Sequence, residues 1–180
     1  MRTDAALLLA GLAVAGCDLL SAPERPSSHG GADAPASGSG GSFAHSQSED
    51  LSGYYQAAGE RSRGQARLAR VFIGQARDFE AWEAGKRSGG FAPILLEFER
   101  ADGGGERVLP DSYSVSDGRV RMSGTGETLG RVSFDGRLNT GSLATARRNL
   151  GEGEEPVMTG VATIAGRSDS GLKLHWYGGD

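Results

Sequence analysis

The sequence predicts a mainly β fold, which is a small antiparallel barrel or twisted sheet of about seven to nine strands with one or two short helices. Two observations lead to this prediction. Glycine occupies 23 of the 130 positions from residue 51 to residue 180, well above the average of about 7%. The large apolar residues of the same range come in short bursts that alternate with polar residues, which is the period of a strand with one buried face.

The first residues indicate a targeting signal and lie outside this fold. The apolar run from Ala5 to Gly16 is shorter than the roughly 20 residues that a transmembrane helix needs, and it is typical of a secretory signal peptide. The run ends in Val14-Ala15-Gly16-Cys17, which resembles the lipobox of bacterial lipoproteins. The resemblance implies that residues 1–16 are cleaved off and that Cys17 is acylated on its sulfur.

The resemblance to lipoproteins also implies a location. The protein would sit in the bacterial cell envelope, held to a membrane by the acyl chains on Cys17, with its domain facing the periplasm. Two or more acyl chains anchor a protein stably where one chain does not. Asp18 resembles the inner-membrane retention signal of enteric lipoproteins, but the choice between inner and outer membrane stays open.

Residues 17–50 are predicted to be a disordered tether that begins at the lipidated cysteine. From Ser21 to Asp50, 21 of 30 residues are Ser, Gly, Ala or Pro, and only Phe43 is large and apolar. Such a segment cannot bury enough surface to offset its ordering entropy. His29 and His45 are interpreted as solvated, and the globular domain is predicted to span residues 51–180.

Within this domain, alternation of apolar and polar residues predicts the strands. They are expected at residues 51–55, 68–73, 94–99, 113–116, 119–122, 132–134, 137–138, 156–164 and 172–177. In two of them the predicted core faces are Ile94, Leu96 and Phe98, and Leu172, Leu174 and Trp176.

Two Asp-Gly pairs are predicted to form hairpin turns. Asp117-Gly118 and Asp135-Gly136 each separate two alternating runs, and an Asp-Gly pair suits the positive φ values of a type I′ turn. The glycine-rich stretch 124–130, GTGETLG, lies between the hairpins and is followed by a strand pattern. Because a phosphate-binding glycine loop opens a helix, this stretch is interpreted as turn residues.

Two segments break the strand pattern. Residues 77–86 are predicted to form a helix that covers one opening of the barrel, with Asp78 as N-cap and with Phe79 and Trp82 on one face. Residues 142–150 form either a second helix, capped by Ser142, or an irregular loop.

The charge distribution excludes one class of partner. The formal net charge is −4, and residues 51–180 contain 17 acidic and 17 basic side chains, so the excess lies before the domain. A neutral domain lacks the basic surface that nucleic-acid binding requires.

The search for catalytic motifs favours a non-enzymatic protein. The sequence contains no G-x-S-x-G, P-loop or HExxH motif, and His175 is the only histidine after residue 50, so neither a metal site nor a cofactor is predicted. Glu97 and Glu99 are expected on one side of a strand, at a spacing of about 7 Å that suits two-carboxylate hydrolysis. The other interpretation is an ordinary charged strand face.

Two surfaces are candidates for binding. Arg61, Arg63, Arg67 and Arg70 form the densest basic cluster, which suits anionic headgroups or an acidic partner, or else protects a strand edge from aggregation. His175 and Tyr177 flank Trp176 on the predicted outward side of the last strand. They are the second candidate contact.

Together these features predict a lipid-anchored envelope lipoprotein whose β-rich domain binds an unknown envelope protein or envelope component without catalysing a reaction. One alternative is a small barrel that encloses an apolar small molecule. A second alternative is a carboxylate-dependent hydrolase.

Overall fold

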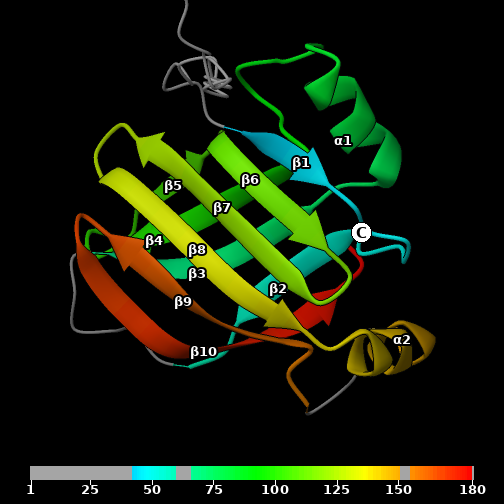
Figure 1. Cartoon of the computed structure of the whole chain (residues 1–180). Helices are drawn as coiled ribbons and strands as arrows, with labels where there is room; N and C mark the ends of the chain where they lie inside the picture. Colours follow the sequence, from blue (N-terminus) through cyan, green and yellow to red (C-terminus); the bar gives the residue numbers. More distant parts are fainter. Residues whose placement is uncertain (1–41, 60–65, 151–154, 180) are drawn as a thin grey trace, which may run out of the picture. The chain divides into compact units, whose positions relative to one another are not determined.

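The computed structural model describes residues 42–59, 66–150 and 155–179, and in these ranges the predicted mainly β fold is confirmed. One curled sheet of ten strands is accompanied by two helices (Figure 1), slightly more strands than predicted. The strands are β1 (Phe43–His45), β2 (Gly53–Ala57), β3 (Ala66–Ile73), β4 (Ile94–Arg100), β5 (Gly105–Val108), β6 (Pro110–Ser116), β7 (Arg119–Gly126), β8 (Gly130–Leu138), β9 (Met158–Ile164) and β10 (Arg167–Tyr177).

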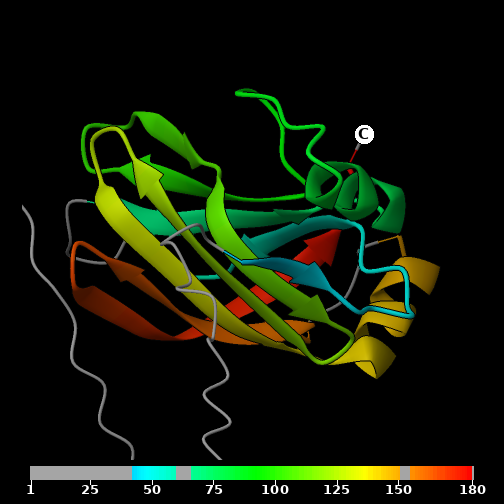
Figure 2. The same cartoon turned by 45° about the horizontal axis from the view of Figure 1, so that its top comes forward.

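The strand order brings the two ends of the sheet together. It is β1-β6-β7-β8-β9-β10-β2-β3-β4-β5, and all neighbours are antiparallel except β1 and β6. The chain passes from β5 at one end to β6 near the other through Leu109 alone. Because this connection is so short, the sheet must curl, and β6 to β10 form one layer facing β2 to β4 (Figures 1 and 2).

The core lies between these two layers. The largest fully buried side chains include Tyr55, Phe79, Phe98 and Phe134, and apolar burial of this kind is the main favourable term in folding. The predicted core residues Ile94, Leu96, Phe98 and Leu174 are buried, while Leu172 and Trp176 are partly buried against the core. We call the side of the sheet that faces this core the inner face and the opposite side the outer face.

The glycine-rich stretch supplies one turn and part of a strand. Gly124 and Gly126 lie buried inside β7, where a side chain would collide with the carbonyl oxygen of Leu109 and with the carboxylate of Glu106. They allow the β5–β6 connection to approach β7 closely. Only the end of the stretch forms the β7–β8 turn, where Gly130 has a φ of +65°.

The first predicted hairpin is confirmed, but its predicted turn type is wrong. Ser116 of β6 pairs with Arg119 of β7, so Asp117 and Gly118 form a two-residue turn. However, φ of Gly118 lies outside the left-handed region, and a type I′ turn requires positive φ at both central residues.

The second predicted hairpin is wrong, because Asp135 and Gly136 lie in the interior of β8. Gly136 pairs with Gly160 of β9, and the ring of Phe134 lies over both residues. A Cβ atom at Gly136 would be 2.6 Å from Phe134 Cε1, and one at Gly160 would be 2.9 Å from Phe134 Cε2. Gly136 is therefore needed for aromatic packing and not for a turn.

The predicted helix over residues 77–86 is confirmed as α1 (Ala76–Glu83), and Phe79 and Trp82 form its buried face. It ends three residues earlier than predicted. The N-cap is Gln75, whose backbone N–H donates to the Asp78 carboxylate at 2.8 Å, so the prediction of Asp78 as N-cap is wrong.

The alternatives for residues 142–150 resolve to a helix, α2 (Thr140–Arg148). Its N-cap is Asn139, whose side-chain oxygen accepts the backbone N–H of Ser142 at 3.0 Å. The prediction of Ser142 as N-cap is thus wrong, because Ser142 supplies the backbone N–H that the N-cap side chain binds. Both helices lie at one end of the curled sheet (Figures 1 and 2). Neither is long and apolar enough to cross a membrane, nor is any other helix in the described ranges.

The predicted end of the tether at Asp50 is wrong. Residues 43–45 form β1, which runs parallel to β6. The Tyr113 N–H donates to Ser42 O at 3.0 Å, and the Ser46 N–H donates to Val115 O at 2.9 Å. Residues 42–50 therefore belong to the domain and are called the strap below. The rest of the predicted tether, residues 17–41, lies outside the described residues.

Side chains of the strap fix it to α1 and to the β6–β7 turn. Phe43 packs edge-on against Tyr113 at a ring distance of 5.2 Å, and His45 Nδ1 lies 2.9 Å from Glu83. The Asp117 carboxylate accepts the backbone N–H groups of Ser48 and Glu49 and the Ser48 hydroxyl, at 2.9, 2.9 and 2.6 Å. His45 is thus not the solvated residue that was predicted.

Candidate functional site

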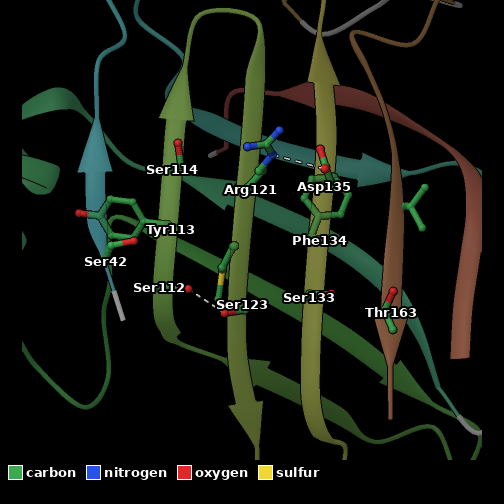
Figure 3. Close-up of a pocket in the computed structure, with 12 residues that line it drawn as sticks. Ser42, Ser112, Tyr113, Ser114, Arg121, Ser123, Ser133, Phe134, Asp135 and Thr163 are labelled. Atoms are coloured by element: carbon green, nitrogen blue, oxygen red, sulfur yellow. Dashed lines mark hydrogen bonds and ion pairs between the residues drawn. The ribbon is translucent and has the colours of Figure 1, made fainter. Parts of the chain in front are cut away.

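A row of hydroxyl side chains crosses five neighbouring strands on the outer face. Strand pairing places them level with one another, one from each of β6 to β10: Ser112, Ser123, Ser133, Thr163 and Ser168. Since neighbouring strands lie about 4.8 Å apart, the row is about 19 Å long. Figure 3 shows four of these residues side by side. We call them the hydroxyl row.

Hydrogen bonds join the hydroxyl row at its two ends. The Ser112 and Ser123 hydroxyls lie 2.8 Å apart, and those of Thr163 and Ser168 lie 3.0 Å apart. Ser133 lies between these pairs, and its hydroxyl has no hydrogen-bond partner among the described residues. The middle of the row is therefore free to bind a ligand.

A charged cluster lies beside the hydroxyl row on β7 and β8, where Arg121 and Asp135 are each two residues from a member of the row. Arg119 binds both oxygens of Asp135, at 2.9 and 2.7 Å, and Arg121 Nε lies 3.4 Å from the same carboxylate. The hydrogen bonds from Arg119 hold the pKa of Asp135 below its usual value, although burial acts in the opposite direction. The same hydrogen bonds raise the pKa of Arg119. Asp135 therefore stays ionised.

All members of the hydroxyl row except Ser168, together with Arg121 and Asp135 of the charged cluster, line an open groove of about 390 Å³. Ser133 and Asp135 are polar lining residues, and Val161 of β9 contributes an apolar group. Ser42 of the strap lines the groove at the side of β6. The full lining is Ser42, Ser112, Tyr113, Ser114, Arg121, Met122, Ser123, Ser133, Phe134, Asp135, Val161 and Thr163 (Figure 3).

The outer face around the groove is basic. The outward positions of β6 to β10 include Arg119, Arg121, Arg131, Arg137 and Lys173. The carboxylates on this face are Asp135 and Asp111, and Asp111 accepts the Thr125 hydroxyl. In the described part of the chain, Arg131, Arg137 and Lys173 have no ion-pair partner. Equal numbers of acids and bases in the domain sequence thus conceal a basic face.

The predicted basic cluster is largely neutralised where it is described. Arg67 and Arg70 of β3 form ion pairs with Glu99 and Glu97 of β4, the second pair at 2.7 Å. A register shift between Leu68 and Arg70 places both arginines on the outer face. Arg61 and Arg63 lie outside the described residues.

The predicted carboxylate pair does share one strand face. Glu97 and Glu99 line a surface depression of about 480 Å³ together with Arg70 and Arg107. Glu97 contacts Arg107 at 3.1 Å in addition to Arg70. Both carboxylates are therefore held by guanidinium groups.

His175 and Tyr177 lie on the outer face of β10, opposite Gln56 and Tyr54 of β2. They do not line the groove. Tyr177 instead begins a row of aromatic residues that continues through Tyr54 and Phe72 to Phe91, with ring distances of 5.1 Å between Tyr54 and Phe72 and 5.8 Å between Phe72 and Phe91. We call these four residues the aromatic row.

The remaining predicted site residues belong to the signal sequence. Val14, Ala15, Gly16 and Cys17 lie outside the described residues. Within residues 42–59, 66–150 and 155–179, no group of three or more His, Cys, Asp or Glu side chains is placed to hold a metal ion.

Sequence reasoning missed the hydroxyl row, although each strand carries part of it. Serine or threonine recurs at alternate positions in 112–116 and 123–125, which marks an outward face. The alignment of one strand with the next depends on the lengths of the turns between β6, β7 and β8 and between β9 and β10, and on the pairing of β8 with β9. Alternation within a single strand reveals none of these.

Comparisons with protein-family models, with curated proteins and with solved structures find no match for this chain.

Proposed function

We propose that the protein is a lipid-anchored binding module of the bacterial cell envelope and that the groove on the outer face of β6 to β9 holds its ligand. The observation that carries this proposal is the convergence of polar side chains from four strands on one groove of about 390 Å³. Ligand sites are concave, with a few well-placed polar groups that fix the ligand's orientation.

The chemistry of the groove supports binding rather than catalysis. A nucleophilic hydroxyl requires a base within hydrogen-bond reach, whereas the Ser112 and Ser123 hydroxyls bind each other. The carboxylate of the groove, Asp135, is bound on both oxygens by Arg119. No lining residue is histidine, cysteine or lysine.

The position of the groove suits a membrane-anchored protein. Ser42, where the strap begins, is one of its lining residues. If residues 18–41 behave as a flexible chain from a lipidated Cys17, their reach is roughly 25 to 30 Å. The groove would then act on envelope components close to the membrane.

The two alternative functions have weaker support. The interior is packed by large buried side chains such as Tyr55, Phe98 and Phe134, which favours a ligand at the surface over an enclosed apolar one. The carboxylates of the hydrolase alternative, Glu97 and Glu99, are bound by arginines.

A sedimentation assay tests the proposed function. The full-length chain in detergent would be mixed with insoluble envelope material, and the bound fraction compared between Ser133→Tyr, which fills the middle of the groove, and Arg107→Tyr, which adds the same side chain on β5. We expect Ser133→Tyr to lose binding and Arg107→Tyr to keep it. Equal binding by the two variants would exclude the groove as the binding site.

A further inference from the structure

We infer that the ligand of this groove is an anionic polysaccharide, an extended sugar chain that carries carboxylate groups. This inference rests on the proposed function and specifies the substrate class of the same site. Three properties of the outer face of β6 to β10 lead to it: polarity, regular spacing and charge.

The polarity of the face argues for a sugar over a protein. Protein interfaces depend on a few large apolar or aromatic anchors near their centre. Among the described residues, the large hydrophobic side chains most exposed to solvent are Phe91, Leu150, Val161 and Tyr177. Only Val161 lies at the groove, and Phe91 and Tyr177 belong to the aromatic row. The groove therefore offers hydrogen bonds in place of apolar anchors.

The spacing of the hydroxyl row suits an extended polymer. The strands place one hydroxyl every 4.8 Å or so along a line of about 19 Å, so that a chain lying across the strands meets an equivalent group at each step. A hydroxyl both donates and accepts hydrogen bonds, and it can pair with sugar hydroxyls and with carboxylates. Ser133, which has no partner among the described residues, lies at the centre of this line.

The charge of the face selects an anionic chain. Arg131 and Arg137 lie on either side of the hydroxyl row along β8 and have no ion-pair partner in the described ranges. Arg121 contacts Asp135 through Nε, which leaves its terminal nitrogens for a ligand. Guanidinium groups bind carboxylates through paired hydrogen bonds.

The test measures binding of the full-length chain in detergent to three probes of similar length. These are an oligogalacturonate, a neutral malto-oligosaccharide and an oligoglutamate, which separate an acidic sugar, a neutral sugar and an acidic peptide. Two outer-face variants remove the proposed contacts, namely the double variant Arg121→Gln with Arg131→Gln and the single variant Ser133→Ala. The control, Arg107→Gln with Arg148→Gln, removes the same charge outside the groove.

We expect the wild type to bind oligogalacturonate more tightly than either other probe. The double arginine variant should bind it about tenfold more weakly or worse, because charged hydrogen bonds are lost, and Ser133→Ala should bind it severalfold more weakly. The control should match the wild type. Binding of oligogalacturonate by the wild type should also weaken as the salt concentration rises.

Three results would overturn this inference. The first is that the neutral sugar binds as tightly as oligogalacturonate and the arginine substitutions have no effect. The second is that oligoglutamate binds as tightly as oligogalacturonate and Ser133→Ala has no effect. The third is that oligogalacturonate does not bind at all. If in any of these cases Ser133→Tyr still abolishes sedimentation with envelope material, the ligand class is wrong and the proposed function stands. If Ser133→Tyr has no effect on sedimentation with envelope material, both the ligand class and the proposed function are wrong.

Discussion

Substituting Gly136 by alanine should destabilise the domain, whereas the same substitution at Gly118 should not. A Cβ atom at Gly136 would lie 2.6 Å from Phe134 Cε1 and 2.8 Å from Met158 Sδ, and both of these side chains are buried. Forcing an extra methyl group into a packed core costs about 1 to 3 kcal/mol. At Gly118 a Cβ atom meets nothing within 4 Å and φ is not left-handed, so the expected change stays within about 0.5 kcal/mol.

Thermal unfolding of the full-length variants in detergent measures this difference. For a domain of this size 1 kcal/mol shifts the melting temperature by roughly 4 °C, so Gly136→Ala should lower it by about 4 to 12 °C and Gly118→Ala by no more than about 2 °C. Adding Phe134→Leu to Gly136→Ala should cost less than the sum of the two single effects, because the smaller side chain relieves the collision.

Two results would refute this reasoning. A larger loss of stability for Gly118→Ala than for Gly136→Ala would mean that the turn glycine, and not the packing glycine, is under constraint. Fully additive effects of Gly136→Ala and Phe134→Leu would mean that the ring of Phe134 does not lie over Gly136.

Three further predictions concern the strap and the anchor. Phe43→Ala should lower the free energy of unfolding in urea by about 2 kcal/mol, since Phe43 is partly buried and truncation of a fully buried phenylalanine costs about 3 to 5 kcal/mol. The control is Phe91→Ala, at an exposed position. Equal effects of the two substitutions would contradict the packing of the strap. The hydrogen bond from Arg147 lowers the pKa of Asp50 from 3.8 to about 2, so this contact stabilises the fold fully above pH 3.8 and the stabilisation is lost as the pH falls towards 2. The melting temperature of Asp50→Asn should therefore fall less steeply over this pH range than that of the wild type. Equal slopes for the variant and the wild type would contradict the contact. Cys17→Ser should abolish incorporation of labelled palmitate, and continued labelling would disprove the lipoprotein assignment.

Sequence patterns predicted the elements that depend on local alternation. The strand at 94–99, the helix face of Phe79 and Trp82, and the turn at Asp117 and Gly118 were each visible within a few residues, and the structure confirms them. In each case the chain's own periodicity or turn chemistry determines the local conformation.

The incorrect predictions concern residues whose role depends on distant parts of the chain. Asp135-Gly136 has the composition of a turn, but Gly160, far along the sequence, pairs with it and Phe134 covers both. Phe43 lies in a polar, low-complexity segment, and only contacts with Tyr113 and with α1 turn that segment into a strand.

The candidate site shows the same division between local and distant information. The alternating serines of β6 and β7 indicate an outward face, but the hydroxyl row exists only because the strand register aligns five strands. Conversely, the cluster of Arg67 and Arg70 is basic in the sequence and neutralised in the fold, because β4 places carboxylates beside it.

Crosslinking in living cells tests the central claim, that the groove binds an envelope component, most directly. A photo-crosslinking residue would replace Ser133 in the groove or, in a second variant, Phe91 in the aromatic row. We predict that light produces an envelope adduct from the Ser133 position and none from the Phe91 position. An adduct from Phe91 with none from Ser133 would contradict the claim and place binding on the aromatic row.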